Sequence, residues 1–385
     1  MQTTRQGFGR HVPRRSGRLR EDKPGCPFQA IREDCNEQET FGALALVAAM
    51  GLPASAIASL QTLSSLFVFG DSLSDGGNSG LVSQAATGGT VTFPPPPYYN
   101  GQYSNGPVAV EYLWNSYNPG DTSFKPSLAG GTNYAIGGAT TGLASYNSVN
   151  PNVPPPLQPA YNDRGNNWQL NTFAEQAPVF DPVSSLFVIW LFPNDLFNYQ
   201  VTGMTSGTAG GAPGFGPAGV DQLIGNGIQN IVDTVLFLES KGAQHFLIPN
   251  LVDIASTPDG NGDPALTAVS QAFNFNLAQA LTFLDAQYTS IEIVQFDTYR
   301  FFSDAIANPA KYGFTNTTES CVANILNGRC NPYDNTWLFW DGSHPTTYAS
   351  SVLGAEFRGS VPEPETFLLV AIGLLGIFVT RRRAV

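Results

Sequence analysis

The sequence has 385 residues, of which 42% are hydrophobic and only 12% are charged. This apolar content is ample for a folded core and excludes a disordered chain, and the length suits one large α/β domain with additional segments at its ends. The formal net charge is −12, and residues 59–360 carry 22 Asp or Glu against 7 Lys or Arg. This acidity argues against nucleic acid as a partner, because binding phosphates needs clustered positive charge.

Residues 41–58 form a short apolar run that ends in small side chains. Ala54, Ala56 and Ala58 are spaced as at the cleavage site of a secretory signal peptide. We therefore interpret residues 1–58 as an N-terminal extension with a signal peptide, which predicts an exported protein. A membrane anchor or a buried helix is the alternative, although the run is short for a bilayer.

Short apolar runs alternate with helical segments through residues 59–360, which we interpret as one domain. This alternation predicts a parallel sheet covered by helices on both faces, which makes a three-layer α/β/α domain. Strands buried on both faces are continuously apolar. Such runs lie at residues 66–70, 132–136, 186–191, 246–249 and 291–296.

Two long helices are predicted in the second half of this domain. Residues 220–240 carry apolar side chains at helical spacing, with Gly242 just beyond the end. Residues 264–287 show the same spacing, with Asp263 placed to cap the helix and Pro264 in its first turn.

Three segments rich in Pro, Asn or Gly interrupt this pattern and are predicted to be surface loops. They lie at residues 94–99, 146–167 and 203–219. Loops of this length in α/β enzymes often overhang the site, so a role in substrate access is one interpretation.

Ser72 lies in the segment LFVFGDSLSDGGN, directly after the first predicted strand. Gly76 and Gly77 follow it and predict a turn that exposes the serine hydroxyl at the carboxyl edge of the sheet, where open α/β folds bind ligands. Ser74, two residues into the turn, is interpreted as a helix-capping hydroxyl.

The motif GDSLSDGGN resembles the opening motif of the GDSL, or SGNH, hydrolases. Further motifs follow in the family's order and cover nearly all of residues 66–350. They are NGQYSNGPVAVEYL at 100–113, GTNYAIGGATT at 131–141, FPNDLFNY at 192–199, FLIPNLVDIASTP at 246–258 and LFWDGSHPT at 338–346. The resemblance implies the SGNH hydrolase fold, a three-layer α/β/α domain with a flavodoxin-like parallel sheet, and the activity of a serine esterase or lipase.

The resemblance also implies an oxyanion hole. Ser72 matches the family's nucleophile, whose backbone N–H is the first oxyanion donor. Gly138 matches the glycine that supplies a second N–H, with the neighbouring Gly137 as the alternative. Asn194 matches the asparagine whose side-chain amide is the third donor.

Asp341 and His344 match the family's DxxH pair. Their chemistry supports the match, because a serine hydroxyl needs an adjacent base and imidazole titrates near neutrality. Asp341 is close enough in sequence to accept a hydrogen bond from the ring, and capping of a following helix is a compatible alternative. The other histidine of the domain, His245, begins an apolar strand and is interpreted as structural. No metal or organic cofactor is expected.

Phe192 and Pro193 depart from the family's pattern, which has a small Gly-x pair before the asparagine. The two bulkier residues predict either a narrower pocket or a tilted Asn194 amide.

Cys321 and Cys330 are the cysteines of the domain, since Cys26 and Cys35 precede the predicted cleavage point. We favour a disulfide that closes a short loop. Two unpaired thiols are the alternative, and the lack of clustered histidines argues against zinc.

The final segment, VPEPETFLLVAIGLLGIFVTRRRAV, resembles the PEP-CTERM sorting signal. Its apolar stretch, residues 366–380, reaches only part of a bilayer core of roughly 30 Å, and the arginines after it would stay on the cytoplasmic side. The resemblance implies that residues 361–385 are a Gram-negative envelope address. A membrane sorting peptidase would read this address after transient anchoring. A permanent anchor is the alternative.

Together these features predict an exported enzyme that hydrolyses a small-molecule or lipid ester through an acyl-Ser72 intermediate. Aromatic residues near the motifs would suit an apolar acyl chain, and they are Phe93, Tyr98, Tyr99, Trp190, Phe192 and Phe197. An O-acetylated exopolysaccharide is an alternative substrate. A surface protein that binds polysaccharide without catalysis is the alternative from another class.

Overall fold

The computed structural model describes residues 60, 62–205, 219–333 and 336–362. The predicted signal peptide, the predicted apolar tail segment and most of the third predicted loop lie outside these residues. Within the described part of the chain, no helix is long and apolar enough to cross a membrane.

Four parallel strands form the central sheet, which confirms the predicted α/β class. Their order in the sheet is β1 (Ser65–Gly70), β2 (Ser185–Trp190), β3 (His245–Pro249) and β4 (Glu292–Phe296). Each begins and ends within one residue of the run that predicted it. For β1, β2 and β3 the reason is that a parallel strand buried on both faces is apolar along its whole length. β4 lies at the edge of the sheet and is partly exposed.

The fifth predicted strand, residues 132–136, is not a regular strand. The segment runs beside β1 and is bound to it by the Val68 N–H to Thr132 O bond of 3.2 Å and the Tyr134 N–H to Val68 O bond of 2.8 Å. The Ile136 N–H also donates to Gly70 O at 3.2 Å, but the pairing amounts only to an isolated bridge between Val68 and Asn133. The prediction was therefore right about position and wrong about regularity.

Because of this edge segment, the order in which the chain adds strands to the sheet changes side at β1. After β1 the chain first pairs on one side of it, through residues 132–136, and then on the other side, through β2. Such a topological switch point leaves a crevice at the carboxyl ends of the strands. Ser72 follows β1 directly and so lies at this crevice.

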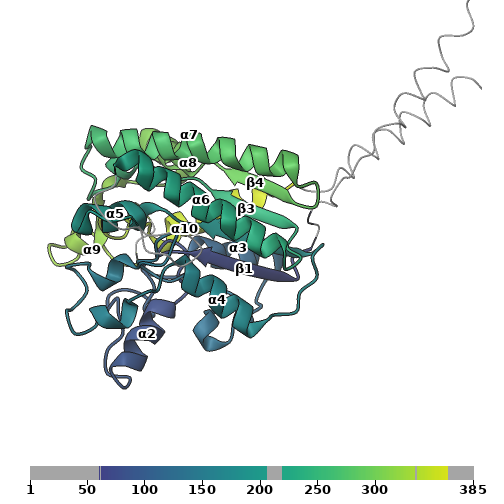
Figure 1. Ribbon diagram of the computed structural model, residues 1–385. Coiled ribbons are helices and arrows are strands. Elements are labelled where there is room, and N and C mark those ends of the chain that lie inside the picture. Colours follow the sequence, from purple (N-terminus) through teal and green to yellow (C-terminus); the bar gives the residue numbers. More distant parts are fainter. Residues whose placement is uncertain (1–59, 61, 206–218, 334–335, 363–385) are drawn as a thin grey trace, which may run out of the picture. The chain divides into compact units, whose positions relative to one another are not determined.

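Helices cover both faces of the sheet and complete three layers (Figure 1). One face packs against α4 (Asn166–Gln176), α6 (Val220–Glu239) and α7 (Pro264–Gln287). The other packs against α3 (Ala109–Tyr117), α8 (Thr298–Ala307) and α10 (Thr347–Ser360). Alternate residues of β1 serve the two cores: Phe67 and Phe69 face the first, and Leu66 and Val68 the second.

Both predicted long helices are present. The first ends one residue earlier than predicted, and the second, α7, has the predicted bounds. Asp263 caps α7 by accepting the Ala265 N–H at 2.9 Å, and Pro264 occupies its first turn. The cap and the proline determine where this helix begins because they satisfy or remove N–H groups that lack a helical partner.

Residues 146–167 were predicted to be a surface loop, and this prediction is wrong in part. They contain 3₁₀ turns at Tyr146–Ser148 and Gln158–Tyr161 and lead into α4. Val153 and Tyr161 are fully buried, and the Tyr161 hydroxyl donates to Ser79 O at 2.9 Å. Apolar side chains between the prolines and asparagines draw the segment into the core.

Smaller elements surround the carboxyl end of the sheet. They are α2 (Asn78–Ala86), α5 (Pro193–Thr202), α9 (Cys321–Asn324) and the two-stranded parallel pair β5 (Asn316–Ser320) and β6 (Trp337–Phe339), with further 3₁₀ turns at Ser127–Ala129, Ile254–Ser256 and Pro309–Tyr312. Cys321 and Cys330 form a disulfide, with their Cα atoms 5.3 Å apart. They pack beside Trp337 and Trp340, next to the loop that carries Asp341.

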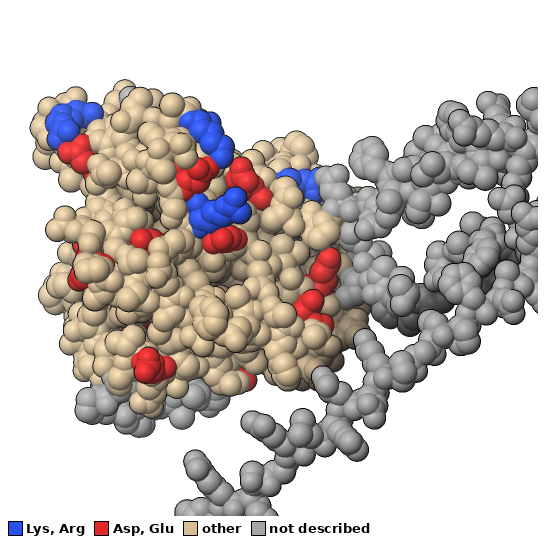
Figure 2. All heavy atoms as spheres, turned by 90° about the horizontal axis from the view of Figure 1, so that it is seen from above, with Lys and Arg blue, Asp and Glu red and all other residues tan. Residues whose placement is uncertain are grey.

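Charged side chains are sparse on the face shown in Figure 2, and most of the Lys and Arg there lie beside Asp or Glu. Two such contacts in the described chain are Lys311 with Asp304 and Arg329 with Glu319. This face therefore presents no extended patch of positive charge.

Candidate active site

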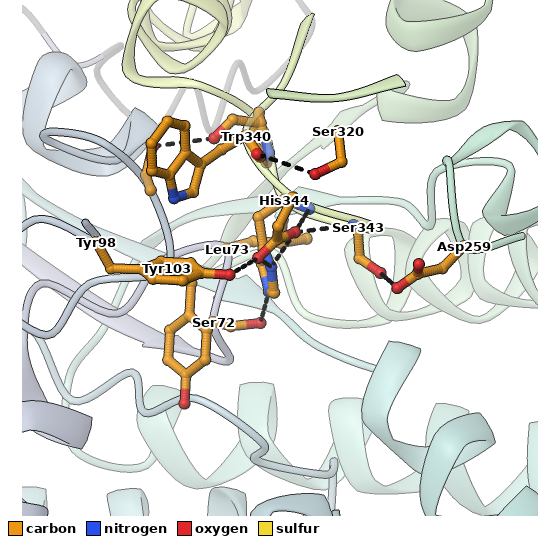
Figure 3. A network of polar contacts seen from close by, with 12 residues as sticks. Ser72, Leu73, Tyr98, Tyr103, Asp259, Ser320, Trp340, Ser343 and His344 are labelled. Carbon is orange, nitrogen blue, oxygen red and sulfur yellow. Dashed lines mark hydrogen bonds and ion pairs between the residues drawn. The ribbon is translucent and has the colours of Figure 1, made fainter. Parts of the chain in front are cut away.

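Ser72, His344 and Asp341 lie in a hydrogen-bonded series at the carboxyl edge of the sheet (Figure 3). Ser72 Oγ is 2.7 Å from His344 Nε2, and His344 Nδ1 is 2.7 Å from Asp341 Oδ2. Ser72 follows β1, whereas the other two residues lie in the loop between β6 and α10. The fold thus joins residues that are 272 positions apart in sequence.

The Ser72 turn is held by two aspartates that flank it. Asp71 Oδ1 accepts the Leu73 N–H at 3.0 Å. Asp75 Oδ1 accepts the N–H groups of Gly77 and Asn78 at 2.8 and 2.6 Å, at the start of α2. These bonds satisfy backbone donors at the beginning of a helix and orient the serine at the pocket.

Gly138 suits the role of second oxyanion donor better than Gly137 does. The neighbouring Gly137 N–H is directed at Asp75 Oδ2, 2.8 Å away, and at Ser79 Oγ, 3.0 Å away. Gly138 has φ of 82°, a conformation that favours glycine, and it lines the same pocket as Ser72. The geometry favours Gly138 over the alternative Gly137.

Asn194 lies in the first turn of α5 and lines the pocket beside Ser72. The next residue, Asp195, binds the loop that follows Gly138: its carboxylate accepts the Thr141 N–H at 2.8 Å and the Thr141 hydroxyl at 2.6 Å. Thr141 also accepts a bond of 3.0 Å from the Asn230 side chain. This buried network holds the Gly138 loop and the Asn194 helix in a common position.

Phe192 does not narrow the pocket as one prediction held. Its backbone has φ of 124°, which is unusual for a residue with a side chain. Its ring is fully buried and stacks on Phe273 with centroids 3.8 Å apart. Pro193 lines the pocket instead. Burial of the ring in the core holds the backbone conformation that glycine would adopt more easily.

The pocket at the site has a volume of about 570 Å³ and a mixed lining. Its apolar side chains include Phe197, Val252, Ile254 and Leu266. Its side-chain amides come from Asn147, Asn150, Asn152 and Gln200, of which Asn147 is buried and already bonded to Tyr103 Oη and Gly137 O. Of the aromatic residues expected near substrate, Phe93, Tyr98 and Phe197 line the pocket, whereas Trp190 is buried and Tyr99 is 43% exposed.

The charges of the site favour a protonated His344. Burial lowers the His344 pKa, but attraction and hydrogen bonding to Asp341, together with Asp71 and Asp259, outweigh burial and raise it. For Asp341, burial raises the pKa, and the contacts with His344 and with nearby backbone N–H groups outweigh that effect and lower it. Each of the two groups therefore stabilises the charged form of the other.

Asp71 differs from Asp341, because burial raises its pKa to about 7. Asp71, Asp259 and Asp341 all line the pocket, and no Lys or Arg is among the described residues around it. Apart from His344 when it is protonated, an anionic ligand would thus meet carboxyl groups and no other basic side chain of the described chain. In the described part of the chain, no three His, Cys, Asp or Glu are grouped so that they could hold a metal ion.

Several contacts of the site were not predicted from the sequence. Tyr103 was not singled out, and its ring centroid lies 5.1 Å from that of His344. Tyr98 was expected near substrate, but its bond to Asp341 was not predicted. Asp75 joins the Ser72 turn to the glycine pair. The repeated Asp in GDSLSD was a signal for the last of these, but the two tyrosines come from a segment that shows no helical or strand pattern. His245 bonds Glu292 on the neighbouring strand at 3.0 Å, in line with its predicted structural role.

A serine, an imidazole and a carboxylate in series at the switch point of a parallel sheet define a serine hydrolase or acyltransferase. Residues 66–357 match the family described as GDSL-like Lipase/Acylhydrolase, and the chain belongs to this family. Residues 360–383 match the PEP-CTERM protein-sorting motif, which indicates export and sorting to the cell envelope.

Relatives of the chain include enzymes with different printed activities. A GDSL esterase/lipase of Arabidopsis thaliana is 27% identical over 342 residues, covering 78% of this chain and 86% of the relative. The phosphatidylcholine-sterol acyltransferase of Aeromonas hydrophila is 26% identical over 278 residues, covering 72% and 70%. The thermolabile hemolysin of Vibrio parahaemolyticus is 24% identical over 305 residues, covering 74% and 60%.

Proposed function

We propose that the chain is an exported serine esterase or lipase that hydrolyses carboxylic esters through an acyl-Ser72 intermediate. The observation that carries this proposal is the 2.7 Å contact between Ser72 Oγ and His344 Nε2, in series with Asp341. A hydroxyl at this distance can transfer its proton to the imidazole as it attacks a carbonyl carbon.

The remaining steps follow from the same geometry. The oxyanion of the tetrahedral intermediate would be held by the N–H groups of Ser72 and Gly138 and by the Asn194 amide. His344 then returns its proton to the leaving alcohol, and Asp341 stabilises the imidazolium in between. Water attacks the acyl group by the reverse sequence, which releases the acid and restores Ser72.

The pocket supports a neutral ester as substrate. Its apolar side chains suit an acyl chain, its accessible amides suit the hydroxyls of the alcohol, and its carboxylates disfavour an anionic group. An O-acetyl group on an exopolysaccharide is a second candidate, supported by the exposed amides of Asn152 and Gln200 in the pocket and by the envelope-sorting motif. A non-catalytic binding role is the third, and the complete hydrogen-bonded series speaks against it.

We also propose that residues 59–360 are the mature domain. In this proposal the signal peptide is removed on export, and a sorting peptidase removes the tail after transient anchoring. Mass spectrometry of the protein isolated from the envelope and the medium would test both cleavages.

Hydrolysis of p-nitrophenyl acetate, butyrate and decanoate by the purified protein tests the activity. We expect turnover with the native protein and loss of at least about 1000-fold with Ser72→Ala, since the nucleophile is absent. A preference for acyl chains longer than acetate would count against the exopolysaccharide. The binding role would be favoured if the folded native protein hydrolysed none of the esters and if the native protein and the Ser72→Ala variant bound polysaccharide equally well.

A further inference from the structure

The Asp341 carboxylate is bound from a distant part of the chain as well as from its own turn. At Oδ1 it accepts the N–H groups of Ser343 and His344, at 2.9 and 2.8 Å. At Oδ2 it accepts the Tyr98 hydroxyl at 2.8 Å, from a residue 243 positions earlier (Figure 3). His344 Nδ1 lies 2.7 Å from this Oδ2 and 2.8 Å from Oδ1. Tyr98 and His344 therefore meet at Oδ2, and the imidazole also contacts the other carboxylate oxygen.

The segment that carries Tyr98 is attached to the Asp341 loop at further points. Ser104 Oγ donates to Pro345 O at 2.9 Å, and the Thr347 N–H donates to Asn105 Oδ1 at 2.8 Å. The Tyr98 ring meets Trp340 edge to face, with centroids 5.9 Å apart. These contacts hold the tyrosine in place without the hydroxyl.

Tyr98 stays a donor at any pH where an esterase works. Burial raises the pKa of its hydroxyl, and the nearby charges of Asp341 and Asp259 raise it further. The other titratable groups that face the pair are Asp71, which acts on His344 by its charge, and Tyr103, whose ring lies against the imidazole.

We propose that Tyr98 is a positioning residue that fixes the Asp341 carboxylate opposite His344 by donating its hydroxyl to Oδ2. The proposal rests on the proposed function. The N–H groups of Ser343 and His344 hold Oδ1. The bond from Tyr98 constrains the other oxygen, so that the whole carboxylate keeps its orientation opposite the imidazole. The same O–H places the positive end of a dipole at the carboxylate, so it moderates the attraction that Asp341 exerts on the imidazolium.

Tyr98→Phe tests this proposal because it keeps the ring and its contact with Trp340. We expect kcat to fall about 10-fold, as for loss of one hydrogen bond to a charged group, with KM for p-nitrophenyl butyrate within about twofold. The acid limb of the kcat/KM profile should move to higher pH, since the undiminished carboxylate charge holds a proton on His344 more tightly. Tyr99→Phe, at the exposed neighbour, is the matched control and should leave rate and profile unchanged.

A double-mutant cycle with Asp341→Asn separates positioning from general stability. If Tyr98 acts through Asp341, Tyr98→Phe should change the residual rate by no more than about twofold in the Asn background. An equal loss in both backgrounds, or a Tyr98→Phe enzyme with native kcat and pH profile, would overturn the proposal.

Replacement of Tyr98 by 3-fluorotyrosine gives a second readout in case the phenylalanine variant does not fold. This side chain keeps the shape and donates more strongly, so the acid limb should move to lower pH, opposite to the shift with Phe. An unshifted limb counts against Tyr98. Failure of the proposed function looks different, because the native protein would then match Ser72→Ala with every ester.

Discussion

At the residue scale, two opposing effects act on the pKa of His344. Burial lowers it, and the attraction of Asp341, Asp71 and Asp259 raises it above its ordinary value near 6.5. Because the proposed base must be neutral, a raised pKa means that imidazolium persists to higher pH and activity is lost earlier as the pH falls.

We therefore expect the acid limb of kcat/KM to have its midpoint above about 6.5, the ordinary imidazole value. Asp341→Asn removes the nearest negative charge, so its residual activity should show a midpoint at lower pH. Burial raises the Asp71 pKa to about 7, so titration of Asp71 could also contribute to the acid limb. The Asp71→Asn variant is the control, because it lacks this titrating carboxyl group. Initial rates between pH 5 and 9 give the acid-limb midpoints of the native protein and the variants. A midpoint below the ordinary imidazole value in the native protein would contradict the expectation that nearby negative charge outweighs burial.

Gly138→Ala tests the proposed oxyanion donor. An added Cβ would lie 2.5 Å from Asn147 Cγ, and the backbone φ of 82° is strained for any residue with a side chain. Alanine keeps the backbone N–H, but relief of this contact and strain would turn the N–H away from the oxyanion. We therefore expect kcat to fall by about 100-fold, as when one oxyanion donor is lost. Gly130→Ala is the matched control, since Gly130 has φ of 77° but no atom within 4 Å of the added carbon. Equal kinetics for the two variants would argue against a donor at Gly138.

At the element scale, the position of α5 depends on a glycine in α6. An alanine Cβ at Gly227 would lie 2.5 Å from the Phe192 ring, whereas at Gly225, in the same helix, it would meet nothing within 4 Å. Gly227 thus admits the ring that anchors the start of α5, and with it the turn that carries Asn194.

Two alanine substitutions in α6 should therefore have opposite effects. Gly225→Ala should raise the free energy of unfolding by about 0.5–1 kcal/mol, because alanine loses less backbone entropy in a helix. Gly227→Ala has the same entropic advantage but displaces the buried Phe192 ring. It should therefore lower the free energy of unfolding by about 1–3 kcal/mol overall. Urea denaturation of both variants measures the difference. Stabilisation by both would show that the ring moves aside without cost.

At the scale of the whole molecule, the disulfide lies outside both large cores and closes a short loop beside the site. The Cys321–Cys330 bond spans nine positions and packs on Trp337 and Trp340, and Trp340 precedes Asp341 in sequence. A cross-link of this size stabilises the fold chiefly by restricting the unfolded chain.

Replacing both Cys321 and Cys330 by serine should lower the free energy of unfolding by about 2–3 kcal/mol, as expected for closure of a loop of this length. Activity at low temperature should remain, because neither cysteine touches the pocket. Thermal melting with and without reductant gives the comparison, in which the double variant should be insensitive to reductant. A native protein that melts at the same temperature in both conditions would contradict this expectation.

The sequence by itself determined the class of fold and the chemical groups of the candidate site. Continuous apolar runs placed four strands, and helical spacing with Asp263 and Pro264 placed α7, because burial on both faces and helix capping leave local patterns. The motifs around Ser72 and His344 identified the groups that lie in series.

Only the tertiary structure decided which of these groups meet and what holds them. The choice between Gly138 and Gly137 depended on where Asp75 directs its carboxylate, and the orientation of Phe192 depended on Gly227 in another helix. Tyr98 reaches Asp341 from a segment without a periodic pattern. Such contacts join residues far apart in sequence, and their side-chain directions follow from packing, which no local pattern of residues records.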